Sequence, residues 1–177
     1  MSIPSKDLAR LVHQELRACG IRHVVGVPDR ETAALWQCFV EDKDTKVITA
    51  CREGEAVGIC AGLHLTGHQP IYCVKNFGFF ESLDTFRVLA VDLRTPLLMF
   101  IGYAGRARPG FEEELRARRG DASSQIVLAG QWTEKILQAI DVPHYTIDKP
   151  DDVQFVRRAV QQAKAESRPV ALLGELP

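Results

Sequence analysis

One acidic residue, Glu53, stands where an α/β protein commonly does its chemistry. The segment 45–67, TKVITACREGEAVGICAGLHLTG, predicts a buried strand that runs directly into a helix, with Glu53 at the joint. Ligands of an open α/β sheet bind outside the carboxyl ends of its strands. A carboxylate in the first turn after a strand is therefore the leading candidate for a catalytic group in this chain.

The predicted helix after Glu53 has a face almost without side chains. Gly54, Gly58 and Gly62 recur along it at a spacing that places them on one side. Each glycine in a helix interior costs about 1 kcal/mol relative to alanine, so three of them require a reason. Another backbone or a flat ligand approaching this face would supply one. The alternative is that the helix packs tightly on its own sheet.

Two further strand ends carry polar groups. The predicted strand at 23–27 ends in the turn GVPD at 26–29, in which Pro28 fixes the backbone. Asp29 either caps the helix expected at 31–41 or belongs to a site at the carboxyl end of the strand.

The segment 75–81 follows the strand expected at 70–74 and is predicted to be a loop rich in phenylalanine. Such a loop offers an apolar wall with a few polar groups, as ligand pockets do. The alternative is that the aromatic rings fold back into the core, which the sequence favours for Phe80. The candidate residues of this loop are Lys75, Asn76, Phe77, Gly78, Phe79, Phe80 and Glu81.

Several familiar sites are missing from the sequence. There is no G-x-G-x-x-G after the first strand, no G-x-x-x-x-G-K-[ST] and no G-x-S-x-G, which argues against dinucleotide, nucleoside triphosphate and α/β-hydrolase chemistry. His64 and His68 are four residues apart, but Gly67 is expected to end the helix between them, so no metal site is predicted. The five cysteines form no C-x-x-C pair and are predicted to be reduced core residues.

Apolar periodicity predicts six strands that alternate with helices. This pattern indicates one three-layer α/β domain over 1–177, with a mostly parallel six-stranded sheet and helices on both faces. Besides the elements above, we expect a helix that Ser5 caps and Gly20 ends, helices at 82–93, at 124–140 in two pieces broken near Gly130 and at 151–165, and strands at 97–101, 144–147 and 170–173.

Composition limits the partners. The chain has 22 basic and 23 acidic residues and a net charge of −1, so neither a nucleic acid nor an anionic membrane surface is expected as a partner. Its apolar runs are far shorter than the roughly 20 residues that span a bilayer, and its first residues lack a secretion signal, which predicts a cytoplasmic protein. The charged segment 104–121 is expected to be a solvated face or an interface rim, with a lid as the minor alternative.

Five motifs in order resemble the pyrimidine-binding (PYR) domain of thiamine diphosphate enzymes, in particular the sulfopyruvate and phosphonopyruvate decarboxylases. They are GVPD at 26–29, REGEAVGICAG at 52–62, KNFGFF at 75–80, the strand LLMFIGY with the following RPG at 108–110, and RPVALLGEL near the C-terminus. The resemblance implies that Glu53 bonds the N1′ nitrogen of the aminopyrimidine and activates the cofactor for attack on a 2-oxo acid. It further implies cofactor contacts from Pro28, Asp29, Asn76, Phe77 and Phe79, and substrate contacts from Arg52, Lys75 and Asn76. The alternative for Arg52 is an ion pair with a neighbouring acid.

The resemblance also implies a partner. Enzymes of this family hold the diphosphate and Mg²⁺ with a separate domain that carries a G-D-G motif, and this sequence has none. We therefore expect no metal ligand in this chain, a beta (PP) subunit that holds both groups, and a hetero-oligomer such as α2β2 or larger. The predicted reaction is decarboxylation of sulfopyruvate or a similar anionic 2-oxo acid. The alternatives are a noncatalytic regulatory or scaffold subunit, a carboligase with the same cofactor, and a stand-alone flavodoxin-like binding module.

Overall fold

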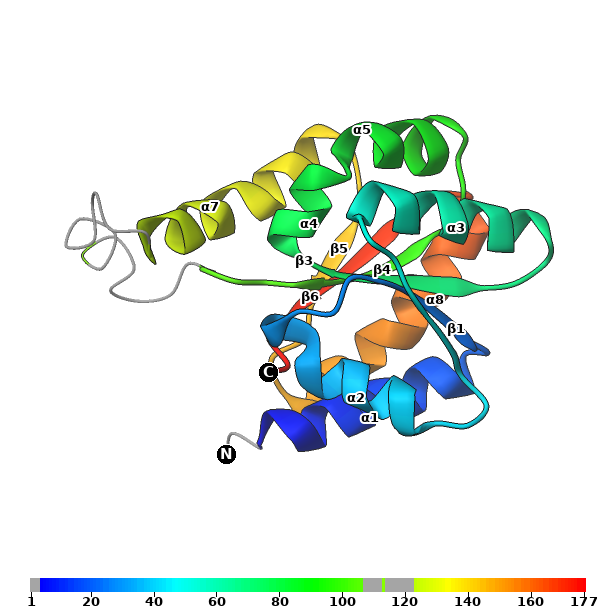
Figure 1. Ribbon diagram of the computed structural model, residues 1–177, viewed down its shortest axis with the longest axis horizontal. Helices are drawn as coiled ribbons and strands as arrows, with labels where there is room; N and C mark the ends of the chain where they lie inside the picture. Colours follow the sequence, from blue (N-terminus) through cyan, green and yellow to red (C-terminus); the bar gives the residue numbers. More distant parts are fainter. Residues whose placement is uncertain (1–3, 107–112, 114–122) are drawn as a thin grey trace.

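A single parallel sheet lies between two layers of helices (Figure 1). The computed structural model describes residues 4–106, 113 and 123–177. The six strands lie in the order β2-β1-β3-β4-β6-β5, and all five neighbouring pairs are parallel. This architecture confirms the predicted fold class. The strands are β1 (His23–Gly26), β2 (Lys46–Thr49), β3 (Pro70–Lys75), β4 (Leu98–Gly102), β5 (His144–Thr146) and β6 (Val170–Gly174).

Helices cover both faces of the sheet, and each face has its own apolar core. The helical elements are α1 (Ser5–Ala18), η1 (Arg30–Thr32), α2 (Ala33–Glu41), α3 (Glu53–Leu65), α4 (Asn76–Glu81), α5 (Leu83–Phe86), η2 (Arg87–Asp92), α7 (Ser123–Ala139), η3 (Pro150–Val153) and α8 (Gln154–Glu166). One core joins α1, α2 and α8 to the sheet, and the other joins α3, α5, η2 and α7 to the opposite face (Figure 1). Strands β3 and β4 are buried almost throughout, as strands covered on both faces must be.

The first helix is amphipathic, but its start differs from the prediction. Pro4 occupies the N-cap position, and Ser5 lies inside the helix, where its hydroxyl donates to the carbonyl of Pro177 at 3.0 Å. Leu8, Val12 and Leu16 of this helix are buried, whereas Leu11 is 37% exposed. Gly20 has φ +89°, the left-handed conformation expected of a residue that ends a helix.

Two predicted interruptions are absent. The expected loop 75–81 is mostly the short helix α4, which begins directly after β3. Helix α7 runs through Gly130 without a break. A Cβ atom on Gly130 would lie 1.6 Å from the carbonyl oxygen of Gly105, so this glycine permits a close backbone approach instead of ending the helix.

The charged segment 104–121 falls largely outside the described residues. Of its described members, Arg106 forms an ion pair with Asp148 beyond β5. The predictions of a solvated rim or a lid concern residues that the structure does not describe. No helix in the described ranges is long and apolar enough to cross a membrane.

The glycine face of α3 is open. A Cβ atom on Gly58 or Gly62 would meet no atom of the described chain within 4 Å, whereas one on Gly54 would lie 3.2 Å from Thr85 Oγ1. Tight packing of this helix on its own sheet, one of the two explanations for the glycines, therefore does not apply to Gly58 and Gly62.

Gly58→Ala should stabilise the isolated chain by about 0.5–1 kcal/mol, because alanine is the better helix former and nothing obstructs its methyl group. Gly26→Ala should instead destabilise it by about 1–3 kcal/mol or prevent folding, because the new Cβ would overlap the backbone of β3. That Cβ would lie 1.8 Å from the carbonyl oxygen of Cys73. Urea unfolding of both variants measures the difference, and a loss of stability in Gly58→Ala would show that this face is packed.

Candidate active site

Glu53 is the first residue of α3 and follows β2 after the three residues 50–52, of which Arg52 is extended. It therefore lies at the carboxyl edge of the sheet, as predicted. Its side chain is half-buried, and no hydrogen bond or ion pair links its carboxylate to another described residue. A carboxylate in this state keeps its acceptor positions for a ligand.

The side chain of Glu53 packs directly against Gly78 in α4. A Cβ atom there would lie 2.4 Å from Glu53 Oε1, 2.5 Å from Cγ and 2.7 Å from Cδ. Any other residue at position 78 would thus occupy the space of the glutamate side chain. The glycine of the KNFGFF motif is explained by this contact between α3 and α4.

Glu81, at the end of α4, fixes the first turn of α3. Its carboxylate accepts a hydrogen bond from the Gly54 amide at 3.0 Å and from Arg52 Nη2 at 2.6 Å. These hydrogen bonds lower the pKa of Glu81, the backbone one most. Of the two predicted roles of Arg52, contact with a substrate anion or with a neighbouring acid, the structure has the second. Sequence reasoning missed this role of Glu81 because the pair joins residues 29 positions apart.

A second charged cluster lies at the carboxyl ends of β1 and β3. Asp29 caps η1 by accepting from the Glu31 amide at 3.2 Å, and Lys75 Nζ lies 3.5 Å from Asp29 Oδ1 and 3.1 Å from Glu31 Oε2. Asp29 therefore has the predicted capping role and also faces a cation at the sheet edge. Pro28 is exposed beside it.

The pKa values of the two carboxyl groups in this cluster, Asp29 and Glu31, are shifted in opposite directions. Burial would raise the pKa of Glu31, but the contacts of its carboxylate with Asp29, Arg30 and Lys75 outweigh it and lower that pKa to about 2. Burial and the neighbouring Glu31 raise the pKa of Asp29. Sequence reasoning did not single out Glu31, since an acid at a helix start usually faces solvent.

Two predicted contact residues of α4 are buried. Asn76 is 0% exposed and donates to the Ala104 carbonyl at 2.8 Å and to Thr133 Oγ1 at 3.1 Å, so it ties α4 to α7. Phe79 is also 0% exposed and packs edge-on against Phe86 in the core, which is the core alternative for this ring. Both side chains thus have packing roles in this chain, and their contacts with a cofactor or substrate stay predictions. Phe77 is 37% exposed, with its ring centroid 5.0 Å from Lys75 Nζ.

The two histidines four apart do not share a helix face. His68 lies beyond α3 and its ring is 4.5 Å from that of His23. Within the described ranges, no three histidine, cysteine, aspartate or glutamate side chains are placed to hold a metal ion. All five cysteines are free thiols, and Cys51 is exposed, whereas Cys60 and Cys73 are buried.

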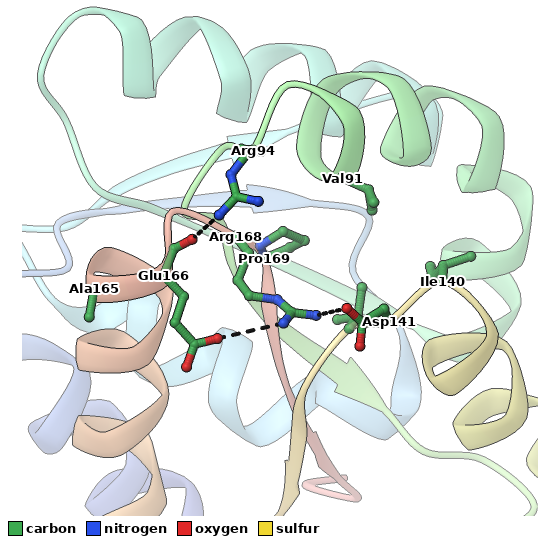
Figure 2. Close-up of a pocket in the computed structure, with 9 residues that line it drawn as sticks. Val91, Arg94, Ile140, Asp141, Ala165, Glu166, Arg168 and Pro169 are labelled. Atoms are coloured by element: carbon green, nitrogen blue, oxygen red, sulfur yellow. Dashed lines mark hydrogen bonds and ion pairs between the residues drawn. The ribbon is translucent and has the colours of Figure 1, made fainter.

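A cavity of about 430 Å³ lies at the opposite end of the sheet, beside the amino ends of β4, β5 and β6 (Figure 2). Its two arginines are engaged by the protein itself. Arg168 pairs with Asp141 at 3.0 Å, and Arg94 donates to the Glu166 carbonyl at 2.7 Å. The cavity is therefore remote from Glu53 and offers no unpaired charge to a ligand.

Comparison with known proteins identifies the family. Residues 6–120 match the family model "Thiamine pyrophosphate enzyme, N-terminal TPP binding domain". The chain belongs to this family. It is similar to sulfopyruvate decarboxylase subunit alpha of Methanococcus maripaludis, with 26% identity over 94% of this chain and 93% of the relative. The same-named subunit of Methanocaldococcus jannaschii is 29% identical over 92% of this chain and 89% of the relative.

Solved structures agree on the fold. Benzoylformate decarboxylase from Polynucleobacter necessarius superposes with a TM-score of 0.66 at 19% identity, over 96% of this chain. This chain spans only 30% of that longer protein. At this identity the likeness concerns the fold alone.

The residues at the carboxyl edge fit the aminopyrimidine of thiamine diphosphate. A half-buried carboxylate without a partner among the described residues can bond a ring nitrogen, and Gly78 leaves the space that the Glu53 side chain itself occupies. These residues do not provide the several cations that a diphosphate requires, because Arg52 is exposed and paired with Glu81, which leaves Lys75 as a single enclosed ammonium beside Glu31.

Gly78→Ala should displace Glu53 at little cost to the fold. The glutamate is flexible and can rotate away, and a helix gains from losing a glycine, so the free energy of unfolding should change by less than about 1 kcal/mol. A misplaced catalytic group costs roughly a hundredfold in rate. We therefore expect cofactor-dependent activity of the assembled protein to fall about that much. Full activity in this variant would contradict the assigned geometry.

Glu31 should make the fold sensitive to acid. Its pKa falls from 4.5 in the unfolded chain to about 2 in the folded one, so the stability it contributes is complete above pH 4.5 and is lost as the pH drops toward 2. The raised pKa of Asp29 acts in the opposite sense. Urea unfolding across this range should show a steeper loss for the wild type than for Glu31→Gln, and equal slopes would refute the assignment.

Proposed function

We propose that this chain is the alpha subunit of a two-subunit, thiamine diphosphate-dependent decarboxylase of a 2-oxo acid, either sulfopyruvate or a similar anionic one. The observation that carries the proposal is the Glu53 carboxylate next to Gly78 at the carboxyl edge of the sheet, which has no partner in the part of the chain that the structure describes. Support comes from relatives named sulfopyruvate decarboxylase subunit alpha, which match over nearly the whole chain.

The task of Glu53 is to hold and move one proton. Bound thiamine diphosphate supplies the electron sink for the carbanion left when carbon dioxide departs. Glu53 accepts or donates the proton at the N1′ nitrogen of the aminopyrimidine. Because Arg52 and Glu81 pair with each other, neither neutralises Glu53, and the Glu81 bond to the Gly54 amide keeps the first turn of α3 in place.

We assign the substrate anion to Lys75 in preference to Arg52. The Lys75 ammonium lies at the carboxyl end of β3 with 19% of its side chain exposed, whereas Arg52 is 76% exposed and held by Glu81. Phe77 supplies an exposed apolar surface beside this ammonium, and Pro28 and Asp29 form the neighbouring rim. A ligand between these groups would meet both an apolar wall and a cation.

The proposal includes a second chain. Relatives named "subunit alpha" imply a partner, and this sequence has no phosphate-binding motif of its own. We assign the diphosphate and Mg²⁺ to that beta subunit, in an α2β2 or larger assembly in the cytoplasm. The open face at Gly58 and Gly62, which continues to Leu65 at 85% exposure, gives this chain an unpacked surface for such a contact.

Glu53→Gln should reduce decarboxylation by roughly a hundredfold to ten-thousandfold while the complex still assembles, since the amide keeps the shape but cannot carry the proton. Glu55→Gln is the matched control. Glu55 is exposed two residues away on the same helix, where it only accepts from the Cys51 amide at 2.9 Å. Carbon dioxide release from sulfopyruvate by each variant with its partner subunit is the measurement.

Full activity in Glu53→Gln would reject the assigned role. If the assembled wild type bound no thiamine diphosphate, the chain would be a noncatalytic scaffold subunit instead. Formation of a carbon–carbon bond without net release of carbon dioxide would identify a carboligase.

A further inference from the structure

Glu31 is a buried carboxylate that takes no direct part in the proposed proton transfer. It is 4% exposed, and three segments enclose it. Its carbonyl accepts a hydrogen bond from the Leu176 amide at 2.8 Å, and a Cβ atom on Gly102 would come within 2.9 Å of its own Cβ. The end of β4 and the C-terminal segment therefore fix Glu31 on the loop after β1.

Both oxygens of this carboxylate face cations. Oε1 accepts from Arg30 Nη2 at 2.9 Å, and Oε2 lies 3.1 Å from Lys75 Nζ. Arg30 is 78% exposed, so most of its charge is screened by solvent. Lys75 lies at the carboxyl end of β3 and is largely enclosed, and Glu31 is the more buried of the two carboxylates that contact its ammonium.

A lysine at a binding site needs such an anchor. Its ammonium sits on a flexible four-carbon stem and can donate in three directions. Glu31 Oε2 and Asp29 Oδ1 lie 3.1 and 3.5 Å from Lys75 Nζ, and the Phe77 ring centroid is 5.0 Å away. These contacts hold the ammonium, and 19% of the lysine side chain remains exposed.

Stability alone is a poor reason for this arrangement. Enclosing a carboxylate costs desolvation, and an apolar residue of similar size often serves a core equally well. A buried acid that fixes one ammonium at a sheet edge is better explained by the use of that ammonium.

We propose that Glu31 is a positioning residue that holds the Lys75 ammonium where it binds the anionic group of the 2-oxo acid substrate. The inference rests on the proposed function and names the recognition element of the same site. The chemistry recognised is a carboxylate or a sulfonate, the two anionic groups that sulfopyruvate carries.

A double-mutant cycle on the assembled, cofactor-loaded enzyme tests the proposal. Lys75→Met should raise the KM for sulfopyruvate by roughly ten- to a hundredfold, the usual worth of a charge-assisted hydrogen bond, with a smaller change in kcat. Glu31→Gln should raise KM in the same sense, and the double variant should be no worse than Lys75→Met alone. Glu31→Asp, which keeps the charge, should recover part of the loss. If the KM increase in the double variant equals the product of the two single increases, Glu31 acts independently of Lys75 and the proposal is overturned.

A labelling experiment gives a readout that does not need activity. Acylation of Lys75 in the folded full-length chain, followed by mass spectrometry, should be several-fold faster in Glu31→Gln than in the wild type, because the freed side chain reaches solvent. The exposed Lys43 serves as the internal standard. Equal rates at Lys75 would overturn the positioning role. If the wild-type complex is active but Lys75 is acylated at the same rate in Glu31→Gln as in the wild type, only this inference is refuted. If the wild-type complex shows no decarboxylase activity but Lys75 is acylated faster in Glu31→Gln, the proposed function is refuted and the Glu31–Lys75 coupling is established.

Discussion

The contact between the Glu53 side chain and Gly78 is the constraint on which the candidate site depends. It joins two helices that begin after different strands, β2 and β3, with β1 between those strands in the sheet. Only a residue without a side chain at position 78 lets α4 approach α3 while the glutamate stays at the edge. The site is therefore a property of the parallel sheet, which brings separate strand ends to one border.

Most charged side chains described along this edge of the sheet form ion pairs with one another. Arg52 and Glu81 neutralise each other, and Lys75 lies among Asp29 and Glu31, whereas Glu53 has no partner among the described residues. An acid beside an arginine would stay ionised and would be a poor carrier of a proton at neutral pH. Placing Arg52 on Glu81 keeps the nearest strong cation away from the group that must exchange a proton.

Local patterns in the sequence predicted the parts of the fold that local forces decide. Alternation of apolar runs with helical periods predicted a mostly parallel sheet of six strands, and Glu53 was placed at its edge because it lies at the predicted joint of strand and helix. The error arose where distant contacts decide. Gly130 was predicted to break a helix, but its role depends on the backbone of Gly105. The burial of Asn76 beside Thr133 and Ala104 likewise depends on distant residues. Phe77 and Phe79 could not be told apart by residue type, since only the packing of α4 decides which ring enters the core.

The C-terminal segment reaches across the sheet to the loop after β1. Leu176 is fully buried, donates its amide to the Glu31 carbonyl at 2.8 Å and accepts from the Ala34 amide at 2.9 Å. This border of the sheet thus cannot reach its final shape while residue 176 is still inside the ribosome. Ligand recognition there waits until residue 176 has been made, even though Glu31, Glu53 and Lys75 emerge early in synthesis.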